Sequence, residues 1–258
     1  MSDTHRGLIL DQFTRQAQLF STAAPITSES ALRMILAAAR PRPDDTMLDI
    51  ACGGGLVVCA FAPHVKQATG FDMTPAMLGQ AEKLAGEKGL TNVSWRQGDA
   101  TVLPYAGASF DIVTSRFSFH HFPDPPAVLR EMVRVCAPGG RILVIDSYAS
   151  EDAGKAAEFN RLELLRDPSH VRNLALSELK GLFAAAGLGE PQLSFYELRD
   201  TVTNLLARSF PNAGDDAKII AMFRASAADD RLGIPIRLVG DAIEYAYPVA
   251  ILAAERPA

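Results

Sequence analysis

Short apolar runs alternate with amphipathic stretches from residue 46 onward, and this alternation predicts an α/β fold. Runs of strand length lie at residues 46–51, 68–71, 93–97, 111–115 and 141–145. Helical spacing of apolar residues separates most of these runs. Strands that alternate with helices form mostly parallel sheets, covered on both faces and joined by right-handed crossovers. We therefore expect a doubly wound, mostly parallel sheet.

The pattern changes after residue 147. Two more strands are predicted at residues 192–198 and 245–253, which brings the expected sheet to seven strands. The stretch at about 201–232 is amphipathic and predicts helices. Because ligands bind at the carboxyl ends of the strands in such sheets, we interpret this stretch as a helical lid over that edge.

The chain is expected to form one domain with three successive parts. Residues 1–45 show helical spacing and predict a cap, ended by Pro41 and Pro43. Residues 46–147 form the expected ligand-binding core, and residues 148–258 complete the sheet and carry the lid. A chain of 258 residues is long enough to bury a sizeable core in such a domain.

Composition and charge narrow the classes of partner. Hydrophobic residues make up 48% of the chain, charged residues 21%, and the formal net charge is −5. An acidic surface argues against a nucleic-acid substrate. No apolar run approaches the length of a membrane span, and Met1–Asp11 lacks the apolar run of a signal peptide. These features predict a cytoplasmic protein, as a monomer or homodimer.

The three cysteines suggest no special chemistry. Cys52, Cys59 and Cys136 form no C-x-x-C pair, and their number is odd. We therefore expect free thiols in a reducing compartment and neither a disulfide framework nor a metal site.

The main candidate site is the glycine-rich turn after the first strand, Leu48-Asp49-Ile50-Ala51-Cys52-Gly53-Gly54-Gly55. Glycines let a backbone turn tightly and approach a ligand closely, as in Rossmann-like sites. A carboxylate at Asp49, however, would repel a pyrophosphate. It suits a ligand with a positively charged amine and disfavours an NAD-dependent oxidoreductase.

Two further carboxylates follow the next two strands. Asp72 stands where Rossmann-like sites place an acidic residue that binds ribose hydroxyls. Asp99, within Gly98-Asp99-Ala100, could accept a hydrogen bond from an adenine amine. Each aspartate alone could be an ordinary loop or cap residue, but together they indicate a nucleoside ligand.

With these motifs in place, the chain resembles class I S-adenosylmethionine-dependent methyltransferases, in the branch that includes the ubiquinone and menaquinone biosynthesis enzymes. The resemblance covers about residues 46–147. It rests on the glycine-rich turn, on the segments that contain Asp72 and Asp99, and on the following pieces: Phe110–Val113, His120-His121-Phe122-Pro123-Asp124 and Arg134–Gly140.

The resemblance implies a cofactor, S-adenosyl-L-methionine, and a role for each matching residue. A loop under the methionine part of the cofactor would be formed by Ala51, Cys52, Gly53 and Gly55. Asp49 would hold the methionine amine, directly or through water. The family usually has glycine where this chain has Ala51, and we expect binding to survive that difference.

The nucleoside end is assigned in the same way. The resemblance implies that Asp72 binds both ribose hydroxyls, that Met73 packs on the adenine, and that Asp99 binds the adenine amine beside Ala100. Ser115 and Arg116, just past the fourth strand, would line the methionine end.

The catalytic residues are less determined by the sequence. A methyltransferase can act by alignment alone, but a hydroxyl acceptor benefits from a base. His120 and His121 follow the fourth strand, and Asp146 ends the fifth, so a His–Asp pair could take a proton. Some sugar O-methyltransferases of this superfamily have a similar segment. Alternatively, His121 packs at the following helix and His120 only shapes the pocket.

Other residues have two interpretations as well. His170 could face the acceptor or lie in a surface loop. An apolar acceptor pocket or the ordinary core would account for the aromatic residues Phe13, Phe20, Phe117, Phe119 and Tyr148. The sequence predicts methyl transfer to a small-molecule acceptor at carbon, oxygen or nitrogen. The alternative is a protein that binds S-adenosylmethionine or S-adenosylhomocysteine without transferring a methyl group.

Overall fold

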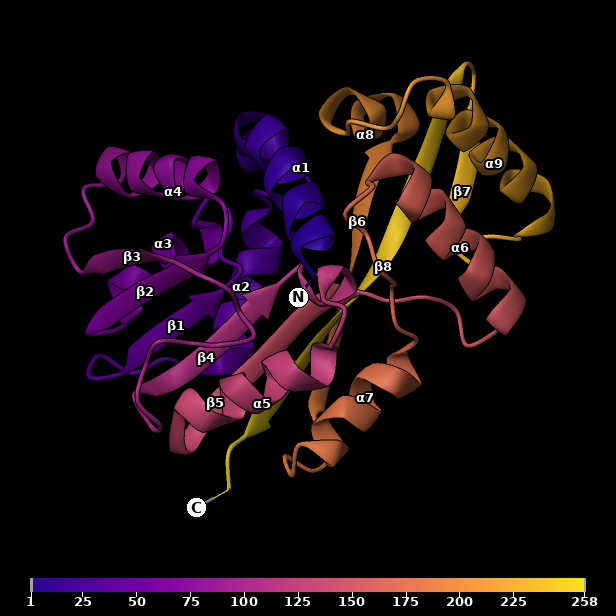
Figure 1. The fold of residues 1–258 in the computed structure, drawn as a ribbon. Helices are drawn as coiled ribbons and strands as arrows, with labels where there is room; N and C mark the ends of the chain where they lie inside the picture. Colours follow the sequence, from indigo (N-terminus) through magenta and orange to yellow (C-terminus); the bar gives the residue numbers. More distant parts are fainter. Residues whose placement is uncertain (1, 258) are drawn as a thin grey trace.

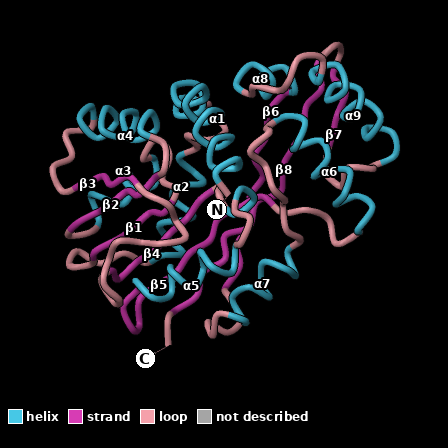
Figure 2. Tube along the Cα trace, viewed as in Figure 1, coloured by secondary structure: helices cyan, strands magenta, loops and turns pink. Residues whose placement is uncertain are grey.

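One central sheet runs through the computed structural model, which describes residues 2–257 apart from the side chain of Phe20 (Figures 1 and 2). Its strand order is β3-β2-β1-β4-β5-β8-β6, and β7 pairs with β8 off this path. The strands are β1 (Thr46–Ile50), β2 (Gln67–Asp72), β3 (Val93–Gln97), β4 (Phe110–Arg116), β5 (Cys136–Ser147), β6 (Gln192–Thr201), β7 (Ile236–Val239) and β8 (Ala242–Glu255).

Helices cover both faces of the sheet, as the alternating pattern predicts. The helices are α1 (Asp3–Thr22), α2 (Glu29–Ala39), α3 (Leu56–Phe61), α4 (Pro75–Glu87), α5 (Pro125–Val135), α6 (Ala153–Arg166), α7 (Leu176–Ala185), α8 (Val202–Arg208) and α9 (Asp215–Asp229), with short 3-10 turns η1 (Ala62–His64) and η2 (Phe119–His121). One face carries α2, α3 and α4, and the opposite face carries α5 and α7. Buried apolar side chains fill both interfaces.

Strands β1 to β5 pair with one another in parallel. Strand β8 pairs antiparallel with β5, β6 and β7. The sheet has eight strands in the described residues, so the prediction of seven was wrong. The strand missed is β7, whose four residues form a hairpin with β8 through Gly240 and Asp241, and Gly240 has φ +57°. A strand of four residues is too short to show a clear alternation.

Strand β8 joins two differently built halves of the sheet. Its second half pairs with β5, from Ser147 opposite Val249 to Arg141 opposite Glu255. Its first half continues past the carboxyl end of β5, where it pairs with β7, and β6 pairs with β8 along both halves, from Glu244 to Ala253. The predicted lid contains α8 and α9, which lie on this extension (Figure 1).

Helix α1 lies across the carboxyl edge of the parallel strands, between α4 and α8 (Figure 1). It packs closely on the glycine-rich turn, because a Cβ atom at Gly54 would lie 2.2 Å from the Ser21 hydroxyl oxygen. The chain thus covers this edge from both of its ends. Among the described residues, no helix combines the length and the apolar character that crossing a bilayer requires.

Candidate active site

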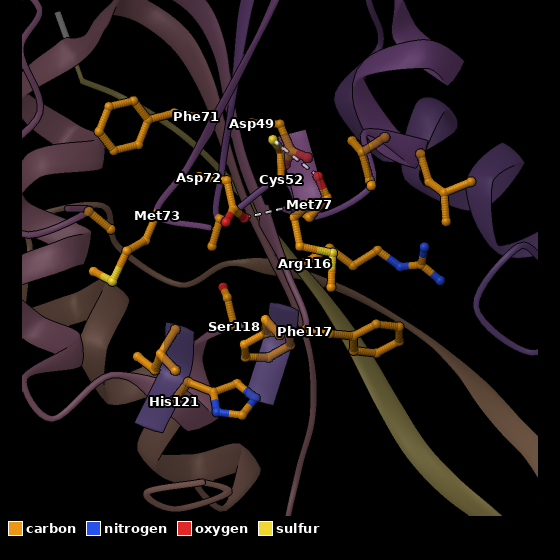
Figure 3. A pocket seen from close by; sticks show the side chains of 18 of the residues that line it. Asp49, Cys52, Phe71, Asp72, Met73, Met77, Arg116, Phe117, Ser118 and His121 are labelled. Atoms are coloured by element: carbon orange, nitrogen blue, oxygen red, sulfur yellow. Dashed lines mark hydrogen bonds between the residues drawn. The ribbon is translucent and has the colours of Figure 1, made fainter. Parts of the chain in front are cut away.

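A cavity opens at the carboxyl ends of β1, β2 and β4, and α1 contributes Ile9, Phe13 and Ser21 to its lining. Figure 3 shows this cavity from close by. We call it the first cavity. The predicted cofactor residues that line it are Asp49, Ala51, Cys52, Gly53, Asp72, Met73, Ala100 and Arg116. In Figure 3, Asp49 and Asp72 lie on one side of the cavity, and Phe117 and His121 lie on the other.

The glycine-rich turn takes a left-handed backbone path that brings it close to its neighbours. Ala51 has φ +54°, Gly53 has φ +51° and Gly55 has φ +76°. A side chain at Gly55 would collide with Trp95, at 2.6 Å. The left-handed region favours glycine, so Ala51 carries a modest backbone strain at the position where the resembling family usually has glycine.

The carboxylate of Asp49 is buried and short of hydrogen-bond donors. Its side chain accepts a 2.6 Å hydrogen bond from the Thr114 hydroxyl, and the residue is 2% exposed. Burial raises the pKa of Asp49 to about 7, against the lowering effects of Thr114 and Arg116. Such a carboxylate is stabilised by a cation placed beside it.

Asp72 is held rigidly by the backbone around it. Its two oxygens accept hydrogen bonds of 2.8 Å each from the Gly53 and Thr74 amides. Burial raises the pKa of Asp72, although these two amide donors oppose that shift. Each carboxylate oxygen has a second lone pair for a ligand hydroxyl, and the bond to Gly53 ties the turn to β2.

Arg116 supplies a guanidinium group that the protein only partly engages. Its Nη1 donates to the carbonyl of Ile26 at 3.0 Å, and the group stacks 4.5 Å from the Phe117 ring centre. Its Nε and Nη2 atoms are buried without a hydrogen-bond partner among the described residues. Arg116 contributes to the lining of the first cavity, and its two unpartnered donors lie in the buried part of the side chain.

Three predicted cofactor residues lie beside the first cavity and do not line it. The carboxylate of Asp99 accepts from the Thr101 amide and hydroxyl at 2.9 and 2.7 Å, while its neighbours Gly98 and Ala100 are in the lining. Ser115 is fully buried and donates to the Ile50 carbonyl at 2.7 Å, joining β4 to β1. Gly55 lies at the start of α3.

A second cavity adjoins the first, and the two share Phe13, Ile26, Phe117 and His121 in their linings. The second cavity extends toward the β6–β8 half of the sheet. Its further lining residues are Gln16, His120, Ser147, Glu163, Arg166, Asp167, Leu198, Leu205, Arg208, Tyr245, Tyr247 and Val249.

His120, which lines the second cavity, forms a buried pair with Asp146 behind it. The His120 Nδ1 atom lies 2.7 Å from Asp146 Oδ1, and the His120 amide donates to the other carboxylate oxygen at 3.2 Å. Burial disfavours the charged imidazole, but Asp146 outweighs burial and raises the pKa of His120. The bond at Nδ1 leaves the Nε2 atom of His120 for other partners.

The two neighbouring histidines have different surroundings. The Nδ1 atom of His121 bonds to the Ser169 carbonyl at 3.0 Å, and burial together with His120 lowers the pKa of His121 to about 4. His170 is buried, contrary to the surface-loop interpretation, and bonds to Asn160 at 2.9 Å. Burial lowers its pKa too, and it is not among the lining residues of either cavity.

The remaining polar wall of the second cavity is already paired within the protein. Tyr247 donates to Glu163 at 2.6 Å, and Glu163 also accepts from Arg166 at 2.8 Å. Arg208 pairs with Asp200, which lies outside the lining. These groups are fixed before any ligand arrives.

Sequence reasoning missed several lining residues. It gave no cofactor role to Ser118, Met77 or Phe71, although all three line the first cavity. It also missed the charged wall of the second cavity, since Glu163 and Arg208 are far apart in the chain. Among the aromatic candidates, Phe13 and Phe117 line both cavities, whereas Phe119 is packed in the core and Tyr148 packs against Phe195. The side chain of Phe20 lies outside the described residues.

Comparison with known proteins identifies the family. A family model described as a methyltransferase domain matches residues 48–144. An uncharacterized methyltransferase of Bacillus subtilis, YcgJ, is 34% identical over 219 residues, which cover 85% of this chain and 87% of that protein. A demethylmenaquinone methyltransferase of Deinococcus radiodurans is 42% identical over 103 residues, which cover 39% of this chain and 42% of the relative.

Solved structures agree with this assignment. The crystal structure of YcgJ superposes with a TM-score of 0.83 at 32% identity, over 90% of this chain and all of that one. A putative methyltransferase from Bacillus halodurans gives a TM-score of 0.82 at 27% identity, over 89% of this chain and all of that one. The shared fold, the similarity along most of the chain and the matching domain place this protein in the methyltransferase family.

Proposed function

We propose that the protein binds S-adenosyl-L-methionine in the first cavity and transfers its methyl group to a small molecule held in the second. The observation that carries this proposal is the junction of the two cavities at Phe13, Ile26, Phe117 and His121. A methyl donor and an acceptor must meet at such a junction.

The residues of the first cavity fit this cofactor. The buried carboxylate of Asp49 has a raised pKa, and an ammonium group beside it would lower that pKa again. Asp72 offers fixed lone pairs for ribose hydroxyls. The backbone at Gly98 runs against Phe71, where a Cβ atom would lie 2.3 Å from the ring, and both residues line the first cavity together with Met73, where we place the adenine.

The second cavity provides what methyl transfer requires of the protein. When bound, the cofactor supplies a methyl group on a positively charged sulfur, and the acceptor forms its new bond to carbon as the carbon–sulfur bond breaks. Asp146 holds the His120 ring through Nδ1, so Nε2 can take the proton that a hydroxyl acceptor gives up. Helix α1 lines part of both cavities, through Phe13 in each, and so limits the access of water to the site.

Titration calorimetry with S-adenosylhomocysteine, with NAD as the control, tests the cofactor. We expect micromolar binding of the first compound and none of the second. Failure of folded protein to bind S-adenosylhomocysteine would overturn the proposal. A screen of acceptors then separates an active enzyme from a protein that binds the cofactor without methyl transfer, because only the enzyme produces methylated product.

Three expectations from the sequence complete the proposal. We propose that the chain acts as one methyltransferase domain, in the cytoplasm, as a monomer or homodimer. The acidic net charge of −5 supports a small molecule as the acceptor in preference to a nucleic acid.

A further inference from the structure

Helix α1 buries two glutamine side chains that have unused hydrogen-bonding atoms. Gln12 and Gln16 lie one turn apart, 1% and 3% exposed. Both amide atoms of Gln12 and the Nε2 atom of Gln16 have no hydrogen-bond partner among the described residues. Buried polar groups are nearly always paired in native proteins, so the folded chain carries these amides at a cost in stability.

Gln16 lines the second cavity, on the wall that α1 contributes beside Phe13. Other polar groups of this cavity already have partners within the protein: Tyr247 and Arg166 bond to Glu163, and His120 bonds to Asp146, which lies outside the lining. Gln16 is therefore the neutral polar group on this wall that is free to bind a ligand. An amide can donate to an oxygen and accept from a hydroxyl.

The charges around the second cavity argue against an anionic acceptor. Both arginines of the lining already have carboxylate partners, Arg166 in Glu163 and Arg208 in Asp200. Asp167 adds another buried carboxylate to the same wall. The lining holds two carboxylates and two arginines, so it offers no surplus positive charge to an anionic acceptor, and a buried negative charge without a partner is costly.

We propose that Gln16 determines acceptor specificity by hydrogen bonding to a polar group of an uncharged acceptor, at a point away from the atom that is methylated. This inference rests on the proposed function, because it takes the second cavity to be the acceptor site. A site that hydrogen bonds a polar group discriminates strongly against an analogue that lacks it. Gln12, one turn earlier on the same face, also has side-chain amide atoms without a hydrogen-bond partner among the described residues.

The first test replaces the amide with an apolar chain of equal length. We expect Gln16→Met to raise Tm by about 2–4 °C, because it removes an unpaired buried polar group, and to leave S-adenosylhomocysteine affinity unchanged. Gln12→Met should also raise Tm. The control, Gln18→Met, lies exposed on the same helix and should leave Tm within about 1 °C. A lower Tm for Gln16→Met would show that its amide is structurally bonded and overturn the inference.

The second test compares three acceptors: phenol, hydroquinone and 4-hydroxybenzoate. Wild-type enzyme should favour hydroquinone over phenol by about tenfold in kcat/KM and methylate 4-hydroxybenzoate least. Gln16→Met should remove that preference mainly through KM, with kcat little changed. A preference for 4-hydroxybenzoate, an unchanged preference in the variant, or no methylation of hydroquinone would each overturn the inference. If the wild-type protein does not bind S-adenosylhomocysteine, the proposed function is overturned instead.

Discussion

Two aspartates at the ends of neighbouring strands have opposite hydrogen-bonding environments. Asp72 receives two backbone amides, whereas Asp49 receives a single hydroxyl from Thr114. The pKa of Asp49 is raised to about 7 as a result of its burial. Asp72 is therefore suited to accept hydrogen bonds from neutral hydroxyls, whereas Asp49 is suited to a positively charged partner.

Replacing Asp72 tests the first of these roles. We expect Asp72→Ala to weaken S-adenosylhomocysteine binding about tenfold or more in titration calorimetry, because the ribose hydroxyls lose a charged acceptor. Asp152→Ala is a matched control, since exposed Asp152 also accepts two backbone amides but lies outside both cavities. A change of less than twofold for Asp72→Ala would remove Asp72 from the cofactor site.

At the scale of elements, the contact between α1 and the glycine-rich turn forms part of the wall of the first cavity. This contact depends on Gly54, since any Cβ atom there would meet Ser21. The pair His120 and Asp146 likewise joins two elements, η2 and the end of β5. Each contact joins two segments that lie apart in the chain, and one substitution can break each of them.

Gly54→Ala should displace α1 from the turn. We expect a lower Tm and weaker S-adenosylhomocysteine binding, both partly restored by Ser21→Ala, because that second change removes the oxygen 2.2 Å from the new methyl group. The control is Gly79→Ala in α4, where a Cβ atom meets nothing within 4 Å, and this change should stabilise the helix by about 0.5–1 kcal/mol. Equal behaviour of the two alanine variants would contradict the packing argument.

The His120–Asp146 pair predicts the pH dependence of turnover. Only a neutral imidazole accepts a proton, so with a hydroxyl acceptor the rate should rise as pH rises through the raised pKa of His120. Asp146→Asn should lower that pKa and shift the profile to lower pH. The shift is measured as kcat against pH.

His120→Ala tests the base directly. We expect turnover to fall by about a hundredfold or more, with S-adenosylhomocysteine affinity within about twofold of wild type. Exposed His64, remote from both cavities, supplies the control variant His64→Ala. Equal turnover in wild type and His120→Ala would exclude His120 as the base.

The sequence predicted the parallel half of this molecule better than the rest. Glycines and carboxylates at strand ends signal a site because parallel strands end at one edge, so Asp49 and Asp72 could be named in advance. Met73 was named only through the family resemblance. Gln16, Glu163 and Arg208 could not be named in advance, since their meeting depends on how α1, α6 and α8 pack over β8. The short β7 was missed because four residues show too little alternation.

At the scale of the whole molecule, we expect the ionisation of Asp49 to couple folding to the proposed binding of the cofactor. Its folded pKa of about 7 lies above the ordinary value of 3.8. The folded state therefore holds a proton that the unfolded state releases between these values, and stability falls as pH rises through this window. An ammonium ligand reverses the effect, because it binds best to the ionised carboxylate.

Two measurements follow from this linkage. Affinity for S-adenosylhomocysteine should rise with pH up to about 7 and then level off, while Asp49→Asn should bind weakly with little pH dependence. The stability advantage of the Asp49→Asn apoprotein over wild type should grow as pH rises from 5 to 8 in denaturant unfolding. A constant difference across this range would show that Asp49 ionises normally.

The extension of β8 past the end of β5 has a consequence for how such enzymes diversify. The matched methyltransferase domain ends at residue 144, whereas Glu163, Leu205 and Tyr247 of the second cavity come from later segments. Mutations in that later half can change the compound that is methylated without touching the matched domain, in which we place the nucleoside site. Descent from a shared ancestor with quinone-modifying relatives therefore passes on the reaction and leaves the choice of substrate open to selection.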